Sequence, residues 1–519
     1  MILLRPIGLV FAIAFFGINS FAQSPALVSF DDLKFNSGFE REAFSGIQRD
    51  SIDYLSLFLA VSPSSDKELR DRISKRIQLE TEKISQKKFE KLKDEKKVER
   101  VFELINGDVL IQYREETLFP ELLSSGNFNC LTASAFYGFI FSNLGVSFEF
   151  KESANHVHPV AFPGTLQIKV ETTDPIFGFQ YFDAKLKVQF VNYLVFTKKI
   201  SKEEAKSVSA DDIFNKYYFP DSSIGMRELA GLQYLNDAFY NFGKSNFNYA
   251  FQQIQKAYCL YPSDRVSTVM LFLLSWCIAE TDYTEVQDAS FLAFASRFVG
   301  KGLELEMILL EYRNLTEKVL MEKSQVALYD QIYFFLMDAV EIPDVRKAIE
   351  KEYYFQRGRM LLSTFRVKES LTYFETALSV DPNDPEVQAF CVQSIAYTFS
   401  TSSNQEIVNM LEEFELRFPV MQNNESFISL QMLGYLQLGE ERFDFDQPAE
   451  GEVLLKKFEN LFHLHPGISI HYEKVGDAYS AAAVYYFKRN NKAAARDYLN
   501  RGLQFSPENH KLMYRLRAL

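Results

Sequence analysis

Cysteine, histidine and tryptophan are scarce in this chain of 519 residues, which contains four, six and one of them. The cysteines, at positions 130, 259, 277 and 391, are dispersed and not spaced as a disulfide framework. No CxxC motif and no Cys/His ligand set is present, so the sequence argues against a structural zinc site and predicts no metal and no cofactor. Cys259 and Cys277 lie in apolar helical patterns and are expected to be packing residues, although a pair between neighbouring helices stays open.

Positive charge is also in short supply. The chain has 56 Lys and Arg against 69 Asp and Glu, a formal net charge of −13. Such an acidic chain is a poor match for nucleic acid or for anionic lipid, so we expect neither as a partner. Beyond the N-terminus, the longest apolar run, residues 266–279, is shorter than a membrane span and contains three hydroxyl residues, which predicts a buried helix.

Residues 1–22 have the three parts of a secretory signal peptide. Arg5 provides the positive charge, residues 7–16 the apolar core, and Ser20-Phe21-Ala22 a small-x-small cleavage site. We expect cleavage after Ala22, no stable membrane insertion afterwards, and an exported protein that is periplasmic or extracellular.

Residues 24–105 predict N-terminal amphipathic helices. Charged residues are dense from position 65 onward, and apolar residues recur at helical spacing. They are Leu69, Ile73, Ile77, Leu79, Ile84, Phe89, Leu92, Val98, Phe102 and Ile105. A helix pair that covers the next domain with a solvated outer face is favoured over a basic contact surface, because Glu and Asp are interleaved throughout.

Residues 106–200 contain the residues with chemical potential. The turn-forming stretch Gly126-Asn127-Phe128-Asn129 precedes Cys130, and an apolar helical pattern then runs to Gly145. This order places the Cys130 thiol at the first turn of a buried helix, where unpaired backbone N–H groups favour the thiolate. Alternation in residues 146–150, 156–162 and 165–175 predicts antiparallel strands after the helix, which is an α+β arrangement.

A thiol nucleophile needs a base and a carboxylate that orients the base. His156 or His158, on one predicted strand, and Asp174, at the end of the next, can meet Cys130 at the N-terminal edge of its helix. The two histidines share strand parity, so periodicity does not separate them. Glu171 is a rival carboxylate of opposite parity to Asp174.

The runs NCLTASAFYGFIFSNLGV, NHVHPVAF and KVETTDP resemble the bacterial transglutaminase-like superfamily, which has a papain-type core. The resemblance covers about 75 residues and implies a catalytic triad of Cys130, His156 and Asp174. Asn127 and Asn129 are ordinary turn formers and are also candidates for oxyanion support. Leu131 stands where animal-type members usually have an aromatic residue, which argues against protein cross-linking as such.

The remaining chain divides into a strand pattern at residues 181–196, a connector at 201–229 that is polar at first, and a helical, repetitive region at 230–519. The repeated features are small residues within helices and a proline after the second helix of each pair: Ala250, Ala257 and Tyr261-Pro262; Gly358, Phe374, Ala377 and Asp381-Pro382; Ala495, Leu499 and Ser506-Pro507. Less regular units end near Pro419 and Pro466. This region is similar to tetratricopeptide repeats, which implies a peptide or protein partner.

Two functions are therefore compared. The first is an exported cysteine amidase, peptidase or acyltransferase whose repeats align a substrate or partner. The second is a non-catalytic binding or assembly protein that retains a transglutaminase-like fold.

Overall fold

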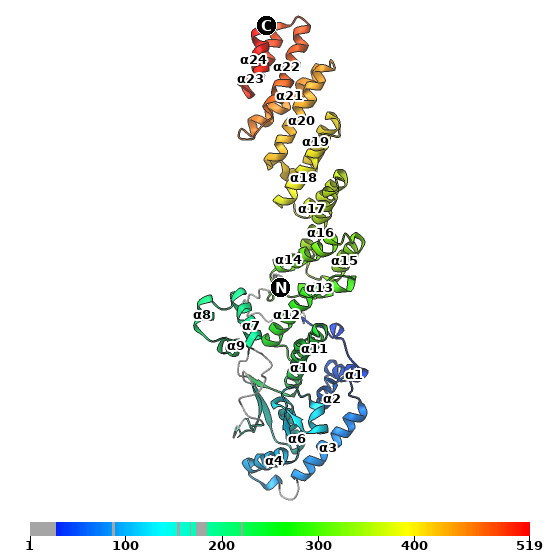
Figure 1. Cartoon of the computed structure of the whole chain (residues 1–519), viewed down its shortest axis with the longest axis vertical. Helices are drawn as coiled ribbons and strands as arrows, with labels where there is room; N and C mark the ends of the chain where they lie inside the picture. The colour runs from blue at the N-terminus through cyan, green and yellow to red at the C-terminus, as the bar shows by residue number, and fades with distance from the viewer. Residues whose placement is uncertain are drawn as a thin grey trace, which may run out of the picture. The chain divides into compact units, whose positions relative to one another are not determined.

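The computed structural model describes residues 27–85, 89–152, 156–163, 165–166, 168–172, 184–218 and 222–519. The predicted signal peptide and Asp174 lie outside the described residues. The chain divides into two compact units, Met1–Glu311 and Tyr312–Leu519. Within the described residues most of the structure is helical, with two small sheets in the first unit (Figure 1). No helix in this described part is both long and apolar enough to cross a bilayer.

The N-terminal segment is helical, as predicted. It forms α1 (Gly38–Gln48), α2 (Tyr54–Ala60), α3 (Lys67–Ser85) and α4 (Asp94–Asp108). Most of the apolar stripe is buried, whereas Leu79 and Phe102 face solvent. Hydrogen bonds join Thr81 of α3 to Asn143, and Asn106 of α4 to Tyr137, at 3.3 Å each, so both helices are fastened to α6 (Cys130–Leu144).

Two small sheets flank α6. Strands β1 (Gln112–Tyr113) and β2 (Asn127–Phe128) pair in parallel, and α5 (Phe119–Ser125) lies between them in sequence. The second sheet has the order β5-β4-β3-β6 and is antiparallel throughout. Its strands are β3 (Phe148–Glu152), β4 (Val157–Ala161), β5 (Ile168–Lys169) and β6 (Ser222–Ile224).

The region after β5 corrects the sequence-based prediction. The pattern at 181–196 predicted a strand, but residues Ala184–Phe196 form helix α7. Its buried residues Phe190, Val191 and Leu194 follow helical spacing, so the packed stripe outweighs the β-propensity of its aromatic and branched side chains. The expected polar connector contains α8 (Lys202–Ser207) and α9 (Ala210–Tyr218). Of the third predicted strand, 165–175, the described residues that form a strand are Ile168 and Lys169 of β5.

The first unit also contains a helix pair, α10 (Met226–Gly243) and α11 (Phe247–Leu260), followed by α12 (Asp264–Ala279) and α13 (Ser290–Ser296). The apolar run at 266–279 is the buried helix α12, as predicted.

Gln233 of α10 accepts a hydrogen bond from the Phe119 N–H at 2.9 Å and donates one to the Phe58 carbonyl at 2.8 Å. Glu152 of β3 forms a buried ion pair with Arg265 of α12 and accepts a hydrogen bond from Tyr261 at 3.0 Å. The helix pair is therefore integrated with the helix and strands that precede it.

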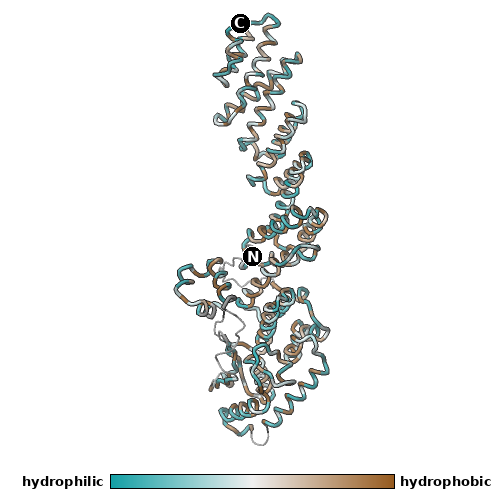
Figure 2. The backbone as a smooth tube through the Cα atoms, viewed as in Figure 1, coloured by the Kyte–Doolittle hydropathy of each residue, from teal (hydrophilic) through white to brown (hydrophobic). Residues whose placement is uncertain are grey.

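The second unit is a succession of helices (Figure 1). After α14 (Leu305–Thr316) come α15 (Val326–Ala339), α16 (Pro343–Ser363), α17 (Val367–Val380), α18 (Pro385–Thr398), α19 (Asn404–Arg417), α20 (Glu425–Asp444), α21 (Pro448–Leu464), α22 (Tyr472–Lys488), α23 (Lys492–Phe505) and α24 (His510–Ala518). Hydrophobic and hydrophilic residues alternate along these helices (Figure 2). The apolar residues collect into two buried clusters, one centred on α17 to α19 and one on α20 to α23.

Four helix pairs in the described part of the chain share one turn geometry. Three residues separate α10 from α11, α16 from α17, α20 from α21 and α22 from α23. The middle residue has a φ of 58 to 66° in every case: Ser245, Phe365, Asp446 and Asn490. The third residue donates its backbone N–H to a carbonyl five residues earlier, at 2.8 to 3.0 Å, which closes the first helix.

The second helix of each of these pairs ends in the same way, and so does α19. The residue after α11, α17, α19, α21 and α23 has a ψ between 65 and 92°, and a proline follows it. A residue before proline is driven out of the helical region by contact with the proline ring, which explains the common end. The predicted ends at Pro262, Pro382 and Pro507, and those near Pro419 and Pro466, are thus confirmed.

Candidate functional site

Cys130 is the first residue of α6, as the sequence predicted. Asn129 caps this helix: its Oδ1 accepts the Thr132 N–H at 2.9 Å, while Thr132 Oγ1 accepts the Asn129 N–H at 3.0 Å. The cap satisfies two backbone donors and fixes the direction in which the helix begins. Cys130 itself is only 2% exposed.

Asn129 also braces the preceding loop. Its Nδ2 donates to the carbonyl oxygens of Glu115 at 2.9 Å and Thr117 at 3.0 Å, so both amide hydrogens are engaged. Asn127, the other candidate for oxyanion support, lies in β2 opposite Gln112. The contacts of Asn129 are those of a structural cap.

Two tyrosines approach Cys130 from other elements. Tyr240 of α10 donates its hydroxyl to the Glu115 carbonyl at 2.6 Å, the same carbonyl that Asn129 contacts. Burial, together with the nearby Cys130 sulfur, raises the pKa of Tyr240 and of Tyr113 well above the usual value. Both phenols are therefore neutral, and both lie within electrostatic range of the thiol. Helix α10, from the region predicted to be repetitive, thus contributes to the surroundings of Cys130.

Strand β4, beside α6, carries His158, and His156 is the residue directly before the strand. Ser134, one helical turn after Cys130, donates its hydroxyl to the Val157 carbonyl at 3.1 Å, which fastens the first turns of α6 to this strand. The rings of His156 and His158 stack with centroids 5.5 Å apart and an interplanar angle of 22°. They lie on the same face of the strand, as their shared parity predicted.

The carboxylate at His156 is that of Glu171. His156 Nε2 and Glu171 Oε2 are 3.1 Å apart, and the other oxygen of Glu171 forms an ion pair with Lys169. Burial lowers the pKa of His156 and outweighs the opposing effect of Glu171, so the imidazole is neutral near pH 7. Burial acts to raise the pKa of Glu171, but Lys169 and His156 together hold it below its usual value.

The structure thus brings His156, His158 and Glu171 together, and the hydrogen bond of Ser134 joins β4 to the helix that begins at Cys130. Asp174, predicted as the orienting carboxylate, is outside the described residues. The resemblance assigned Asp174 to this role, and Glu171 was the rival carboxylate of opposite parity. Val160 lies opposite Lys169, and that register puts Glu171 diagonally across from His156.

Of the other cysteines, Cys277 and Cys391 are buried and Cys259 is half-buried. Burial raises the pKa of Cys277 to about 12 and also raises the pKa of Cys259 and of Cys391. All three are thiols, so the pair between Cys259 and Cys277 is not formed. Among the described residues no group of three His, Cys, Asp or Glu side chains is arranged to hold a metal ion.

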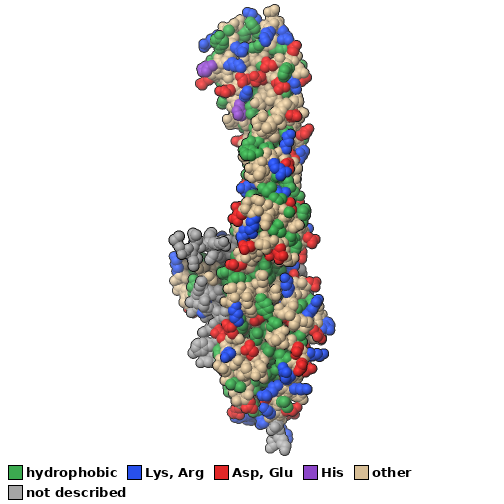
Figure 3. Space-filling view, turned by 45° about the vertical axis from the view of Figure 1, so that its right-hand side comes forward, with side chains coloured by type: hydrophobic (Ala, Val, Ile, Leu, Met, Phe, Trp, Pro, Cys, Tyr) green, Lys and Arg blue, Asp and Glu red, His purple; other side chains and the backbone are tan. Residues whose placement is uncertain are grey.

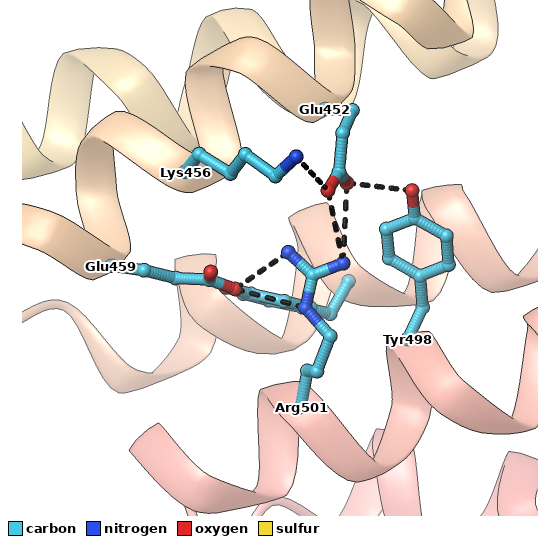
Figure 4. A network of polar contacts seen from close by, with 6 residues as sticks. Glu452, Lys456, Glu459, Tyr498 and Arg501 are labelled. Atoms are coloured by element: carbon cyan, nitrogen blue, oxygen red, sulfur yellow. Dashed lines mark hydrogen bonds and ion pairs between the residues drawn. The ribbon is translucent and has the colours of Figure 1, made fainter.

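The helical region presents a different type of surface. On the face drawn in Figure 3, acidic and basic side chains are interspersed over the C-terminal helices. In the last helix pair, Arg501 of α23 contacts two carboxylates of α21, Glu459 at 2.7 Å and Glu452 at 3.2 Å (Figure 4). Tyr498 also donates its hydroxyl to Glu452, at 2.6 Å. Polar contacts therefore join α23 to α21, in the preceding helix pair, in addition to the apolar core.

Close helix packing depends on small residues, as predicted. The fourth residue of α11, α17, α21 and α23 is small and buried: Ala250, Ser370, Gly451 and Ala495. A Cβ atom added to Gly358 of α16 would lie 2.6 Å from the Phe374 ring of α17.

The family model of the tetratricopeptide repeat matches residues 351–384. The matched segment comprises most of α16, its turn and α17. No curated protein matches the chain. Stacked helix pairs of this kind are surfaces for protein binding, so the repeat match and the helical region together indicate a protein partner.

Proposed function

We propose that this protein is an exported, transglutaminase-like cysteine hydrolase or acyltransferase that acts on an amide of a peptide or protein, and that its helical repeats bind the substrate or a partner. The transglutaminase-like domain would comprise residues 106–200, after N-terminal helices at 24–105, and the repeats residues 230–519, after a connector at 201–229. Export, to a periplasm or to the extracellular space, rests on the signal sequence at residues 1–22.

One observation carries the proposal. Ser134, one helical turn after Cys130, donates a hydrogen bond to the backbone carbonyl of Val157, the residue that directly follows His156. A thiol at a helix N-terminus and a neutral imidazole on the adjoining strand are the two groups that nucleophilic catalysis by cysteine needs. The pairing of His156 with a carboxylate adds the third component of such a site.

The chemical steps follow from these roles. His156 accepts the thiol proton, and the Cys130 thiolate attacks the carbonyl carbon of the amide. Collapse of the tetrahedral intermediate breaks the C–N bond, and His156 returns the proton to the departing amine. Water or a second amine then attacks the thioester carbon, and the Cys130 thiol is restored. The resemblance assigns Asp174 as the residue that orients His156.

Alkylation of the mature protein tests the proposal. With iodoacetamide near pH 7, followed by mass spectrometry of each cysteine peptide, we expect Cys130 to react faster than Cys259, Cys277 and Cys391. The other three are the matched controls, because burial raises the pKa of each. The Cys130→Ala variant should lose the fast label and keep the slow ones. A Cys130 that reacts no faster than its three controls would contradict the enzymatic proposal.

The alternative, a non-catalytic binding or assembly protein, is favoured by the 2% exposure of Cys130 and by the repeat match. Here the transglutaminase-like segment would serve as a scaffold. Partner recovery with wild-type protein and with Cys130→Ala separates the two functions. The alternative fails if complementation of a deletion strain requires the thiol while partner recovery is the same for both proteins.

A further inference from the structure

We propose that Glu171 is the positioning residue of His156: its carboxylate fixes the tautomer of the imidazole and turns the ring toward the start of α6. This inference rests on the proposed function for its chemical meaning. The pairing itself can be measured whether or not the protein is an enzyme.

Glu171 lies at hydrogen-bonding distance from His156, because Nε2 and Oε2 are 3.1 Å apart. A carboxylate with a lowered pKa is only an acceptor, so the hydrogen must be on Nε2. Nδ1 is then the nitrogen that carries the lone pair, which makes it the basic atom of the ring.

Glu171 is itself held in place. Lys169, in β5 and two residues before Glu171, forms an ion pair with Oε1 and leaves Oε2 for His156. The backbone is anchored next to it, because the Val170 N–H donates to the Pro159 carbonyl at 3.0 Å. His156 is 5% exposed but the Glu171 side chain is 41% exposed, so solvent screens this contact in part.

The experiment follows the imidazole directly. Full-length mature protein with [13Cε1]histidine has six labelled rings, which His156→Gln and His158→Gln variants assign. In the wild type we expect His156 to hold its hydrogen on Nε2, with a pKa below the usual value. Its electrostatic surroundings include His158 on β4, Lys169 on β5, and Glu171, which follows β5.

In Glu171→Gln the negative charge is lost while the shape is kept, so the pKa of His156 should fall further and the preference for the Nε2 tautomer should weaken. Glu149→Gln, on β3, is the matched control and should leave both as in the wild type. Asp174→Asn should also leave them unchanged. Should Glu171→Gln not fold, Glu171→Asp keeps the charge but shortens the reach, and we expect the tautomer preference to weaken there too.

Alkylation of Cys130 gives a separate readout. If the proposed function holds, Glu171→Gln should slow it by about tenfold at neutral pH, the effect of one charge-assisted hydrogen bond. An altered His156 signal with an unreactive Cys130 would retain Glu171 as the partner and refute the enzyme. The inference is overturned if Glu171→Gln leaves the tautomer and pKa of His156 unchanged, or if Asp174→Asn shifts them equally.

Discussion

The ammonium nitrogen of Lys256 lies 2.8 Å from a carboxylate oxygen of Glu40, and both side chains are completely buried. Lys256 also donates to Gln253 at 2.8 Å. Burial lowers the pKa of this lysine, and Glu40 opposes that effect. The pair joins α1 to α11, so the N-terminal helix and the first helix pair are held by charges that water does not reach.

Removing one partner of this pair should be strongly destabilising. In Lys256→Met the Glu40 carboxylate remains buried without its counter-ion, and we expect the free energy of unfolding to fall by about 3 to 5 kcal/mol. Urea titration measures this change. Lys96→Met is the control, because Lys96 and its partner Glu99 are at least half exposed, and it should cost far less than Lys256→Met. Similar losses for the two variants would contradict the interpretation.

Asp237 should make stability depend on mildly acidic pH. Burial raises its pKa to about 6, against the hydrogen bond from Gln253. Because the folded protein holds this proton more tightly than the unfolded chain, the free energy of unfolding should decrease as pH rises from about 4 to 6. We expect the wild type to lose about 1 to 3 kcal/mol relative to Asp237→Asn over this range. Denaturant titrations at each pH measure the free energy of unfolding of both proteins. An equal dependence of this free energy on pH in the two would refute the assignment.

Arg501 should be the main polar contact between α23 and α21 (Figure 4). Burial acts to raise the pKa of Glu452, but hydrogen bonds from Tyr498 and Arg501 hold it below its usual value. Arg501→Met should lower the free energy of unfolding by about 1 to 3 kcal/mol, since it removes charge-assisted bonds to both carboxylates. Lys456, 3.4 Å from Glu452 and 64% exposed, provides the control. Hydrogen exchange of α22 and α23 should increase in Arg501→Met and stay as in the wild type in Lys456→Met.

Gly358 should not tolerate a methyl group. A Cβ at this position would overlap the Phe374 ring, so Gly358→Ala should destabilise the second unit by about 1 to 3 kcal/mol despite the better helix propensity of alanine. At Gly467 a Cβ would meet nothing within 4 Å, and Gly467→Ala should be close to neutral. Thermal unfolding measures the stability of the two variants. A larger loss of stability in Gly467→Ala than in Gly358→Ala would contradict the packing argument.

Phe365 should be a poor residue for its turn. It is 81% exposed and has a φ of 58°, a left-handed conformation that costs a bulky side chain energy. Phe365→Asn should therefore raise the free energy of unfolding by about 1 kcal/mol. The reciprocal change, Asn490→Phe at the equivalent turn, should lower it by a similar amount. Stabilisation by the second substitution would refute the shared turn geometry.

Local chemistry made much of the fold predictable. Asn129 before Cys130, and Gly145 with a φ of 68°, set the two ends of α6. The prolines after the second helices and the small residues between helices predicted the paired-helix architecture, which the tetratricopeptide match at 351–384 supports. In each case the signal resides in one residue and its immediate neighbours.

What depends on tertiary packing was not predictable. Residues 184–196 form a helix because Phe190, Val191 and Leu194 are buried together, although Phe190 and Val191 by themselves favour a strand. The contact of Glu171 with His156 depends on a strand register that no turn motif specified. Tyr240 reaches the loop before Cys130 from a helix more than 100 residues away in the chain, so no sequence pattern links them.

The anchoring of α10 has a practical consequence for anyone who wants to express part of the protein. A piece that stops at residue 225 would include every predicted site residue. It would also lack Gln233, which contacts the Phe119 N–H and the Phe58 carbonyl, and Tyr240, which contacts the Glu115 carbonyl. The charge of Glu152 would lose Arg265 in the same cut. Recombinant work on Cys130 should therefore retain the chain through residue 311, and shorter pieces are expected to aggregate.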